Sequence, residues 1–374
     1  MKVLFDLLYY TDSTYEGVRI YGIELIKSFL AYAPDIKLGV LCWDDMEGYI
    51  SEQIEGGGEF VTLPKSRIRS FRKYGTKFLT KEYGSAAKSI ASFDICLCTF
   101  ANDPVCMFSS LVKYVGVVHD LQMVRLVWSS ETRLRALLTV IRWRRQYRKF
   151  DALVTISKQS AHDIQNFCGK SPYVIYNSIK RGSAKSIRPN NLSEGFCEYI
   201  LDINAFHEYK NASTLVRAFA SVVEGWPDMK LYLKGNKTPY LKELNSIIKD
   251  SGVEGRIIVD TENRSEEEIN WLYDNASLFV SPSRMEGFGY TPVEAVFHKV
   301  PVIVSDIDIF HEIDEDCADY FNPDSSEELE KCIRNMLAYG ISKEEKERRY
   351  RKLADKFSAK RQVEEFITVL NRIK

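Results

Sequence analysis

Short runs of apolar and β-branched residues alternate with longer segments of helical period along most of the chain of 374 residues. The runs that predict strands are residues 3–8, 37–42, 95–100, 114–118, 152–156 and 173–175, followed by 199–203, 230–233, 256–259, 277–280 and 300–304. The segments that predict amphipathic helices are 21–33, 158–167, 212–223, 240–251, 266–275, 292–298 and 326–337. Such alternation is typical of parallel sheets covered by helices, so the pattern predicts an α/β fold.

The length of the chain exceeds what one hydrophobic core usually supports, which predicts two domains. A hydrophobic content of 45% with 12% aromatic residues is ample for two cores. Residues 181–196 are polar and contain Gly and Pro, so they are the natural linker between the two halves.

Positive and negative charges are divided unevenly between the halves. Residues 1–190 contain 27 Lys and Arg against 18 Asp and Glu, a net charge of +9, whereas the remainder contains 24 against 34, or −10. This division indicates that only the first half meets an anionic surface. No nucleic-acid recognition motif accompanies the positive charge, so we do not expect a nucleic-acid partner.

Two basic segments that include aromatic residues, 65–81 and 133–149, carry much of this charge. In the second segment leucines, Ile141 and Trp143 recur at helical spacing with arginines opposite, which is typical of a helix at a membrane interface. A solvated helix face is the alternative. The prediction is therefore a first half that rests on an anionic membrane.

No stretch approaches the roughly 20 apolar residues that a membrane span requires. The first residues also lack the charged start, long apolar core and cleavage site of a secretory signal. Eight cysteines are present, but beside Cys96 and Cys98 there is no second close pair to complete a zinc site. We interpret them as buried residues of a reducing cytosol, which predicts a cytoplasmic protein, soluble or peripheral on the membrane.

The most informative segment, residues 281–296, reads Ser-Pro-Ser-Arg-Met-Glu-Gly-Phe-Gly-Tyr-Thr-Pro-Val-Glu-Ala-Val. Glu286 and Glu294 bracket a Gly-Phe-Gly turn between an apolar strand and a helical stretch. Glycines let the backbone approach a ligand, and N–H groups at a helix N-terminus favour an anion such as a diphosphate. The two carboxylates can accept hydrogen bonds from sugar and ribose hydroxyls. The segment predicts a nucleotide-sugar pocket, with a common strand-to-helix turn as the alternative.

The two glutamates, eight positions apart after Ser-Pro-Ser and within Glu-Ala, resemble the Glu-x7-Glu signature of the retaining glycosyltransferases of family 4. This resemblance implies that Glu286 contacts hydroxyls of the donor sugar and that Glu294 contacts the ribose. It also implies that the backbone amides of Phe288, Gly289 and Tyr290 line the phosphates.

The resemblance further implies the GT-B fold, in which two doubly wound Rossmann-like domains face a central cleft. Ligands are then expected at the carboxyl ends of the strands. The first domain, residues 1–185, would be the acceptor side, and residues 197–356 would bind the nucleotide-sugar donor. A C-terminal helix within 357–374 would cross back onto the first domain.

The loop after the first strand of the second domain also resembles the family. There the family carries a basic pair that holds the donor diphosphate, and Lys210 matches one member, with Asn204 also assigned to the donor. The other position is Ala205, so one charge-assisted phosphate contact of about 1.5–3 kcal/mol is missing. Lys234 or Lys237 could supply the absent charge.

In the first domain, His119 ends a strand and can donate to a sugar hydroxyl or a phosphate; a structural histidine is the alternative. By resemblance it lies beside the reaction centre of the donor sugar. Gly17 opens a helix and matches the family's glycine loop, which approaches the donor phosphates and the acceptor. Asp306-Ile-Asp308 is similar to a metal-binding Asp-x-Asp motif of another glycosyltransferase fold but lacks its context, so we expect no metal and no cofactor.

Together these motifs predict a retaining hexosyltransferase that moves a hexose from a nucleotide-sugar to a hydroxyl of a lipid-linked glycan in cell-surface polysaccharide synthesis. Glu286, Lys210 and His119 are the predicted catalytic residues, and the enzyme would work at the inner face of the cell membrane. An Asn-x5-Lys-Asn pattern similar to that of some mannosyltransferases favours GDP-mannose over a UDP- or dTDP-hexose. Two alternatives stay open, a sugar-nucleotide epimerase of the same fold and a non-catalytic nucleotide-sugar-binding subunit.

Overall fold

The computed structural model describes the chain except residues 11–15, 64–82, 102–111, 122–123, 125–132, 180–184 and 197. The basic segment 65–81 lies outside the described residues. The chain forms two compact units, Met1–Asn177 with Ala359–Lys374, and Ser178–Ser358. The first unit thus ends at Asn177 and the second at Ser358, whereas the sequence prediction ended the first domain at 185 and placed the second at 197–356.

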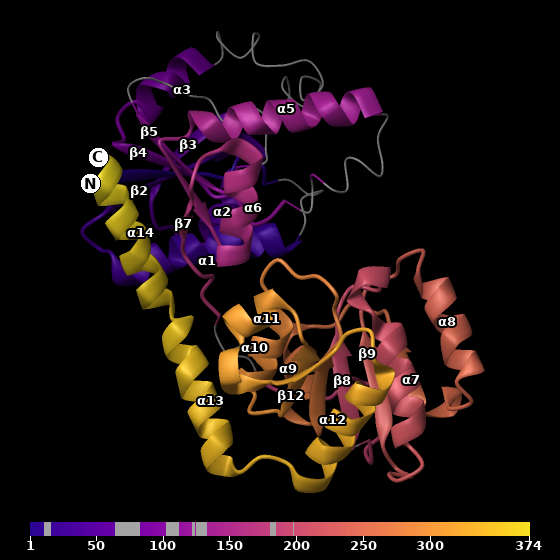
Figure 1. Cartoon of the computed structure of the whole chain (residues 1–374). Helices are drawn as coiled ribbons and strands as arrows, with labels where there is room; N and C mark the ends of the chain where they lie inside the picture. The colour runs from indigo at the N-terminus through magenta and orange to yellow at the C-terminus, as the bar shows by residue number, and fades with distance from the viewer. Residues whose placement is uncertain are drawn as a thin grey trace. The chain divides into compact units, whose positions relative to one another are not determined.

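The first unit is built on a parallel sheet of seven strands in the order β3-β2-β1-β4-β5-β6-β7 (Figure 1). The strands are β1 (Lys2–Asp6), β2 (Lys37–Trp43), β3 (Glu59–Leu63), β4 (Ile95–Cys98), β5 (Lys113–Val117), β6 (Ala152–Thr155) and β7 (Tyr173–Val174). The described helices are α1 (Glu16–Tyr32), α2 (Glu47–Gln53), α3 (Tyr83–Ile90), α5 (Arg133–Lys149), α6 (Lys158–Cys168) and α14 (Ala359–Ile373). Helix α14 packs against α1, with the rings of Phe29 and Phe366 6.0 Å apart.

The second unit contains a parallel sheet of six strands in the order β10-β9-β8-β11-β12-β13. The strands are β8 (Tyr199–Ile203), β9 (Lys230–Lys234), β10 (Ile257–Asp260), β11 (Leu278–Ser281), β12 (Val302–Ser305) and β13 (Asp319–Phe321). The helices are α7 (Ala212–Val222), α8 (Leu241–Asp250), α9 (Glu266–Asp274), α10 (Tyr290–Phe297), α11 (Asp308–Ile313), α12 (Ser326–Tyr339) and α13 (Lys343–Lys356).

Serine side chains set the start of four of these helices. Ser157, Ser265, Ser325 and Ser342 each accept a hydrogen bond from a backbone N–H in the first turn of α6, α9, α12 and α13. Each serine thereby satisfies an N–H group that has no partner within the helix. At α9 the Glu268 carboxylate in turn accepts a hydrogen bond from the Ser265 backbone N–H, which completes a capping box.

Strand order reverses once in each sheet, between β1 and β4 in the first and between β8 and β11 in the second. Connections leave these neighbouring strands in opposite directions, so a crevice opens beyond their carboxyl ends. The loops that follow β8 and β11 therefore diverge around one such crevice. This position is where a doubly wound sheet binds ligands.

The structure differs from the sequence prediction in a few elements. Strands β3 and β13 were not predicted. Strand β3 lies at the edge of its sheet and alternates exposed and buried positions, and β13 has three residues, so neither contains a long apolar run. Helix α13 was also missed because Leu353 is its single buried residue, which leaves no apolar period to detect. No helix in the described ranges has the length and apolar character needed to cross a membrane.

The predicted arrangement of α5 is wrong in one respect. Trp143 does not share a face with Ile141 and the leucines, because its side chain is 5% exposed and packs in the core of the first unit. The reason is geometric, since residues two apart on a helix are separated by about 200°. Leu134, Leu137 and Leu138 face outward instead and are exposed.

Candidate functional site

A lysine and a glutamate meet at the switch point of the second sheet. Lys210 ends a short turn, Glu208–Lys210, in the loop after β8, and Glu286 lies in the loop after β11. Lys210 Nζ is 2.6 Å from Glu286 Oε1, and the two side chains are 14% and 11% exposed. The two residues are far apart in sequence, and they meet because β8 and β11 are neighbours in the sheet.

Asn211 and Arg284 hold these two loops together. Asn211 adopts a left-handed conformation with φ of 60°, and its Nδ2 donates to the carbonyls of Pro282 at 3.0 Å and Pro323 at 2.9 Å. The Arg284 backbone N–H donates to the Tyr209 carbonyl at 2.8 Å, and its guanidinium donates to Asn211 Oδ1. The position of the Lys210–Glu286 pair is therefore fixed by bonds between loops, and the sequence had singled out neither Asn211 nor Arg284 as a link.

Asp202, near the end of β8, is a site residue for which no role was predicted from the sequence. It is buried, and its Oδ1 accepts a hydrogen bond from Asn204 Nδ2 at 2.5 Å. Burial raises the pKa of Asp202 to about 7, against the opposing effects of the Asn204 bond and the charge of Lys210, while Glu286 adds to the rise. Asp202 thus changes charge near neutral pH, close to the Lys210–Glu286 ion pair. The Asn204 side chain is engaged in a hydrogen bond to Asp202.

The glycine turn requires Gly289 for two reasons. Its φ is +85°, a left-handed conformation at the N-cap of α10, and a Cβ there would lie 2.7 Å from the Phe310 ring. The Phe288 side chain is buried with its ring 5.5 Å from that of Phe357, so it anchors the turn. Tyr290, the first residue of α10, is 39% exposed. The turn therefore presents the positive end of α10 beside Glu286.

Glu294 lies in the second turn of α10 and bonds to a buried tyrosine. Its Oε2 accepts from the Tyr273 hydroxyl at 2.9 Å. Burial raises the pKa of Glu294, and the bond from Tyr273 partly offsets this rise. Tyr273, which the sequence did not identify, thus orients the second glutamate of the motif.

Of the two lysines considered as substitutes at Ala205, Lys234 is the closer in the fold. It ends β9, pairs with Ile203 of β8 in register, and its carbonyl accepts the Asn204 N–H at 2.9 Å. Its side chain is buried, which lowers its pKa, while the charge of Asp260 opposes this effect. Lys237 is exposed beyond the strand end.

The carboxylates near Lys234 form ion pairs with Arg264 instead of with Lys234. Arg264 Nε is 2.8 Å from Asp260 Oδ2, and Arg264 Nη1 is 3.1 Å from Glu268 Oε1. No ion pair between Lys234 and a carboxylate occurs within the described ranges. Lys234 is thus a buried cation at the carboxyl edge of the sheet, one strand from the loop that carries Ala205.

His119 lies in the first unit, just after β5. Its Nε2 is 3.2 Å from the Thr99 carbonyl, and its ring packs edge-on against Tyr21 at 4.5 Å. Burial lowers the pKa of His119 to about 4, and the bond to Thr99 partly opposes this. Since a carbonyl only accepts, Nε2 carries the proton of the neutral ring. Nδ1 is then an acceptor, so His119 is suited to receive a bond from a sugar hydroxyl rather than to donate to a phosphate.

Gly17, in the first turn of α1, is not required by packing. No atom lies within 4 Å of a Cβ placed there, whereas one at Gly22 would collide with the Tyr9 hydroxyl. Open space beside Gly17 is consistent with a ligand approaching the backbone at this point. Tyr21, which contacts His119, lies one turn further along the same helix.

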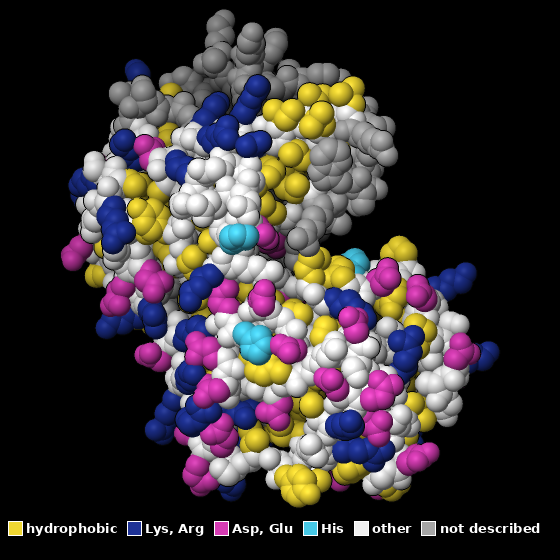
Figure 2. All heavy atoms as spheres, viewed as in Figure 1, with side chains coloured by type: hydrophobic (Ala, Val, Ile, Leu, Met, Phe, Trp, Pro, Cys, Tyr) yellow, Lys and Arg dark blue, Asp and Glu magenta, His cyan; other side chains and the backbone are white. Residues whose placement is uncertain are grey.

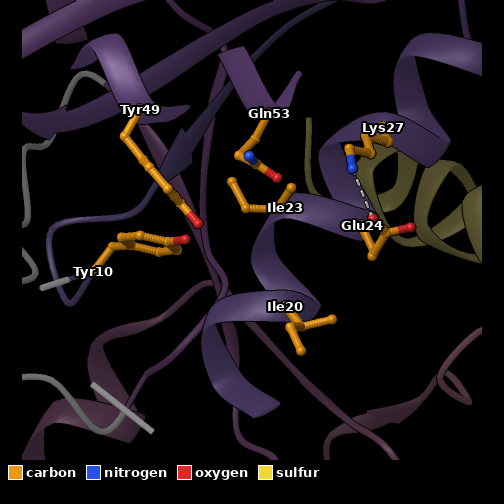
Figure 3. A pocket seen from close by; sticks show the side chains of 7 residues that line it. All are labelled: Tyr10, Ile20, Ile23, Glu24, Lys27, Tyr49 and Gln53. Carbon is orange, nitrogen blue, oxygen red and sulfur yellow. Dashed lines mark hydrogen bonds and ion pairs between the residues drawn. The ribbon is translucent and has the colours of Figure 1, made fainter. Parts of the chain in front are cut away.

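A pocket of about 370 Å³ opens in the first unit between α1, α2 and the segment after β1 (Figure 3). Its lining residues are Tyr10, Ile20, Ile23, Glu24, Lys27, Tyr49 and Gln53. The rings of Tyr10 and Tyr49 are 6.1 Å apart, and Lys27 Nζ is 3.0 Å from Glu24 Oε1. Aromatic faces with a carboxylate, an ammonium and an amide suit the apolar faces and hydroxyls of a sugar.

In the part of the chain that the structure describes, no three His, Cys, Asp or Glu side chains form a group that could hold a metal ion. Asp306 bonds to His311 Nε2 at 2.5 Å, and Asp308 begins α11. Cys96 and Cys98 are buried in β4.

Comparisons with known proteins find a family match within the second unit. Residues 184–357 match the family model of the glycosyl transferases group 1. The O-antigen chain mannosyltransferase RfbU of Salmonella typhimurium is 31% identical over 182 residues, 48% of each chain. The lipopolysaccharide core biosynthesis mannosyltransferase LpsB of Rhizobium meliloti is 32% identical over 108 residues, 28% of this chain and 30% of that protein. The chain thus matches about half the length of RfbU and less of LpsB.

Solved structures share the fold of the whole chain. Sucrose-phosphate synthase from Thermosynechococcus elongatus superposes with a TM-score of 0.70 at 14% identity and covers 100% of both chains. Anabaena HepE, in complex with UDP and glucose, also gives 0.70 at 16% identity, covering 99% of this chain and 100% of that one. This likeness, together with the two parallel-sheet α/β units, confirms the predicted fold class of two doubly wound Rossmann-like domains.

Proposed function

We propose that this chain, which carries a glycosyl transferases group 1 domain in its second unit, is a retaining glycosyltransferase. It moves a hexose from a nucleotide-sugar to a hydroxyl of a lipid-linked glycan in cell-surface polysaccharide synthesis. The observation that carries the proposal is the Lys210–Glu286 pair at the switch point of the second sheet, inside the matched region. A cation and a carboxylate side by side suit a substrate with a diphosphate joined to a sugar.

The chemistry follows from where charge develops. Negative charge grows on the departing nucleoside diphosphate, and Lys210 together with the backbone amides of Gly289 and Tyr290 at the start of α10 stabilises it. Positive charge grows at the anomeric carbon, and Glu286 stabilises that charge and holds a sugar hydroxyl. No residue is assigned as a covalent nucleophile. The incoming hydroxyl enters on the face from which the diphosphate leaves, and the leaving phosphate assists its deprotonation.

Two further residues position the donor in this proposal. Glu294, oriented by Tyr273, accepts hydrogen bonds from the ribose hydroxyls. His119 accepts a bond from a sugar hydroxyl through Nδ1, because Nε2–H is used by the Thr99 carbonyl. Both roles require hydrogen bonding rather than proton transfer.

Mannose is the proposed sugar and GDP-mannose the proposed donor. RfbU and LpsB, similar to this chain over the stretches given above, are both named as mannosyltransferases. HepE was solved with UDP-glucose, so UDP-sugars are the alternative donors. A panel of GDP-, UDP- and dTDP-sugars measured by thermal shift would identify the donor, because a bound ligand stabilises the folded state by about 2.7 kcal/mol at a hundredfold excess over Kd.

Transfer itself is the decisive experiment. Purified enzyme, labelled GDP-mannose and a lipid-linked acceptor glycan should give a labelled glycan whose anomeric configuration matches that of the donor. An altered sugar-nucleotide without glycan product would indicate an epimerase, and binding without turnover would indicate a non-catalytic subunit. A product of opposite anomeric configuration would exclude the retaining mechanism. The family match favours the transferase over either alternative.

On the acceptor side, we assign the glycan to the pocket of the first unit that contains Tyr10 and Tyr49. The exposed ring of Tyr49 provides a face for a sugar, and Glu24, Lys27 and Gln53 provide hydrogen-bonding groups. The volume of about 370 Å³ lies in the range of small-molecule sites.

A further inference from the structure

One surface of the first unit presents apolar side chains to solvent along a helix. Helix α5 carries four such side chains, which we call the α5 apolar stripe: Leu134, Leu137, Leu138 and Ile141, which are 68%, 45%, 58% and 37% exposed. Their spacing of three and four residues places them on one face. The described residues include ten exposed large hydrophobic side chains, and four of them lie on this one helix. Figure 2 shows hydrophobic side chains gathered there beside Lys and Arg side chains.

The stripe is not needed to attach α5 to its own unit. The opposite face already packs inward through Ala136, Trp143 and Tyr147, all at most 5% exposed. Gln146 on that side donates to the Ala101 carbonyl at 2.8 Å. Helix α5 therefore has one face for the core and a second apolar face that fits another partner.

The charge of α5 indicates what that partner is. The helix contains seven Lys and Arg and no acidic residue. Arg142, Arg144 and Arg145 are exposed, and no described residue forms an ion pair or hydrogen bond with their side chains. These three residues, the α5 arginines, continue the helix directly beyond the apolar stripe.

Helix α13 of the second unit provides an internal contrast. It is also rich in basic residues, but Arg348, Arg349, Arg351 and Lys352 each lie within 4.0 Å of a carboxylate. Its single buried residue is Leu353, and acidic side chains alternate with the basic ones. That arrangement is typical of a solvated helix, whereas α5 combines exposed leucines with three arginines whose side chains pair with no described residue.

We propose that α5 is a membrane-docking surface that binds a bilayer of anionic phospholipid. The α5 apolar stripe enters the boundary between headgroups and acyl chains, and the α5 arginines contact lipid phosphates. An apolar face beside unpaired positive charge matches this partner, because a bilayer interface offers hydrocarbon and anionic groups within one side-chain length. The docking surface is argued independently of the proposed function. Only its use in reaching a lipid-linked acceptor rests on the proposed function.

The test measures how much of the full chain sediments with lipid vesicles. Vesicles of phosphatidylcholine alone are compared with vesicles that also contain the anionic lipid phosphatidylglycerol. Wild-type protein should bind the anionic vesicles and be released by salt, since exposed charges are screened within about 8 Å at physiological ionic strength. Leu134→Ser with Leu138→Ser should weaken binding by at least about tenfold. Arg142→Gln, Arg144→Gln and Arg145→Gln together should weaken it by about a hundredfold.

Matched controls come from the second unit. Tyr339→Ser removes a side chain that is 87% exposed, and Lys343→Gln, Lys346→Gln and Arg351→Gln remove the same charge from α13. Both control proteins should bind like wild type. All variants should keep the wild-type Tm and nucleotide-sugar binding, which separates loss of docking from misfolding. Vesicle binding by a protein that transfers no sugar would refute the proposed function and leave this proposal standing.

Three results would overturn the proposal. The first is that wild-type protein does not bind anionic vesicles at low salt. The second is a leucine variant that binds as well as wild type, which would reduce the contact to surface charge. The third is a dimer that the leucine substitutions convert to a monomer without any vesicle binding, which would make a second copy of the chain the occupant of the stripe.

Discussion

Lys210 Nζ lies 2.6 Å from Glu286 Oε1 across the switch point of the second sheet, and both side chains are largely buried. A buried pair is costly to break by removing one member, because the remaining charge is left without a partner. The pair therefore keeps two oppositely charged groups positioned before any substrate arrives. Such preorganisation is what stabilisation of a charged transition state requires.

Replacing Glu286 by Gln should lower kcat by roughly 10²–10³ while changing donor Kd only modestly, because the carboxylate interacts most strongly with charge that develops during reaction. Steady-state kinetics with isothermal calorimetry would measure both. Glu347→Gln on α13, which removes a half-buried carboxylate outside the candidate site, is the control and should retain full activity. An unchanged kcat with a raised KM would show that Glu286 only binds the donor.

Nucleoside diphosphate should bind more weakly as pH rises through about 7. Below this value Asp202 is neutral, and above it the carboxylate places a negative charge near Lys210 and Glu286. Asp202→Asn should reduce this loss of affinity as pH rises. Because the folded pKa lies above the ordinary value of 3.8, stability from this group is complete below 3.8 and is lost as pH rises through about 7. Asp202→Asn should therefore raise Tm at pH 8; equal pH profiles for the two proteins would contradict the assignment.

Lys234 should contribute to binding of the diphosphate. Lys234→Met should weaken nucleoside diphosphate binding by about 1.5–3 kcal/mol if it supplies the charge absent at Ala205. Ala205→Arg in that variant should restore affinity. Calorimetry that finds Lys234→Met unchanged, together with tighter binding by Ala205→Arg alone, would show that the second phosphate contact is simply missing.

Gly17→Ala and Gly289→Ala form an informative pair. Gly289→Ala should lower Tm, because an alanine at φ of +85° costs about 1–2 kcal/mol and its Cβ meets Phe310. Gly17→Ala should leave Tm unchanged, since space is open there, but should reduce transfer if a ligand approaches that backbone. Full activity in a folded Gly17→Ala protein would exclude Gly17 from the site.

Tyr49→Ala should raise KM for the acceptor with little change in donor Kd, because the exposed ring lines the pocket of the first unit. Tyr32→Ala, at an exposed tyrosine outside the residues that line this pocket, is the control. A raised donor Kd with unchanged acceptor KM would assign the pocket to a different ligand.

The sequence by itself determined the parallel α/β architecture and the motif around Glu286. Strand and helix periods are local properties, so the central strands and amphipathic helices could be located within a few residues. The glycine turn was equally readable, because the left-handed conformation at Gly289 is one that few other residues adopt. Elements without an apolar period, such as α13, gave no local signal.

Tertiary structure decided which groups meet. Asn211 and Arg284 connect the two site loops, and Tyr273 orients Glu294, through contacts between segments distant in the chain. The sequence showed that α5 has apolar and basic positions. Packing against the rest of the first unit buries Trp143 in the core and leaves Leu134 exposed. Periodicity fixes which residues share a face, whereas burial of a face depends on the surface that packs against it, and that surface exists only in the folded protein.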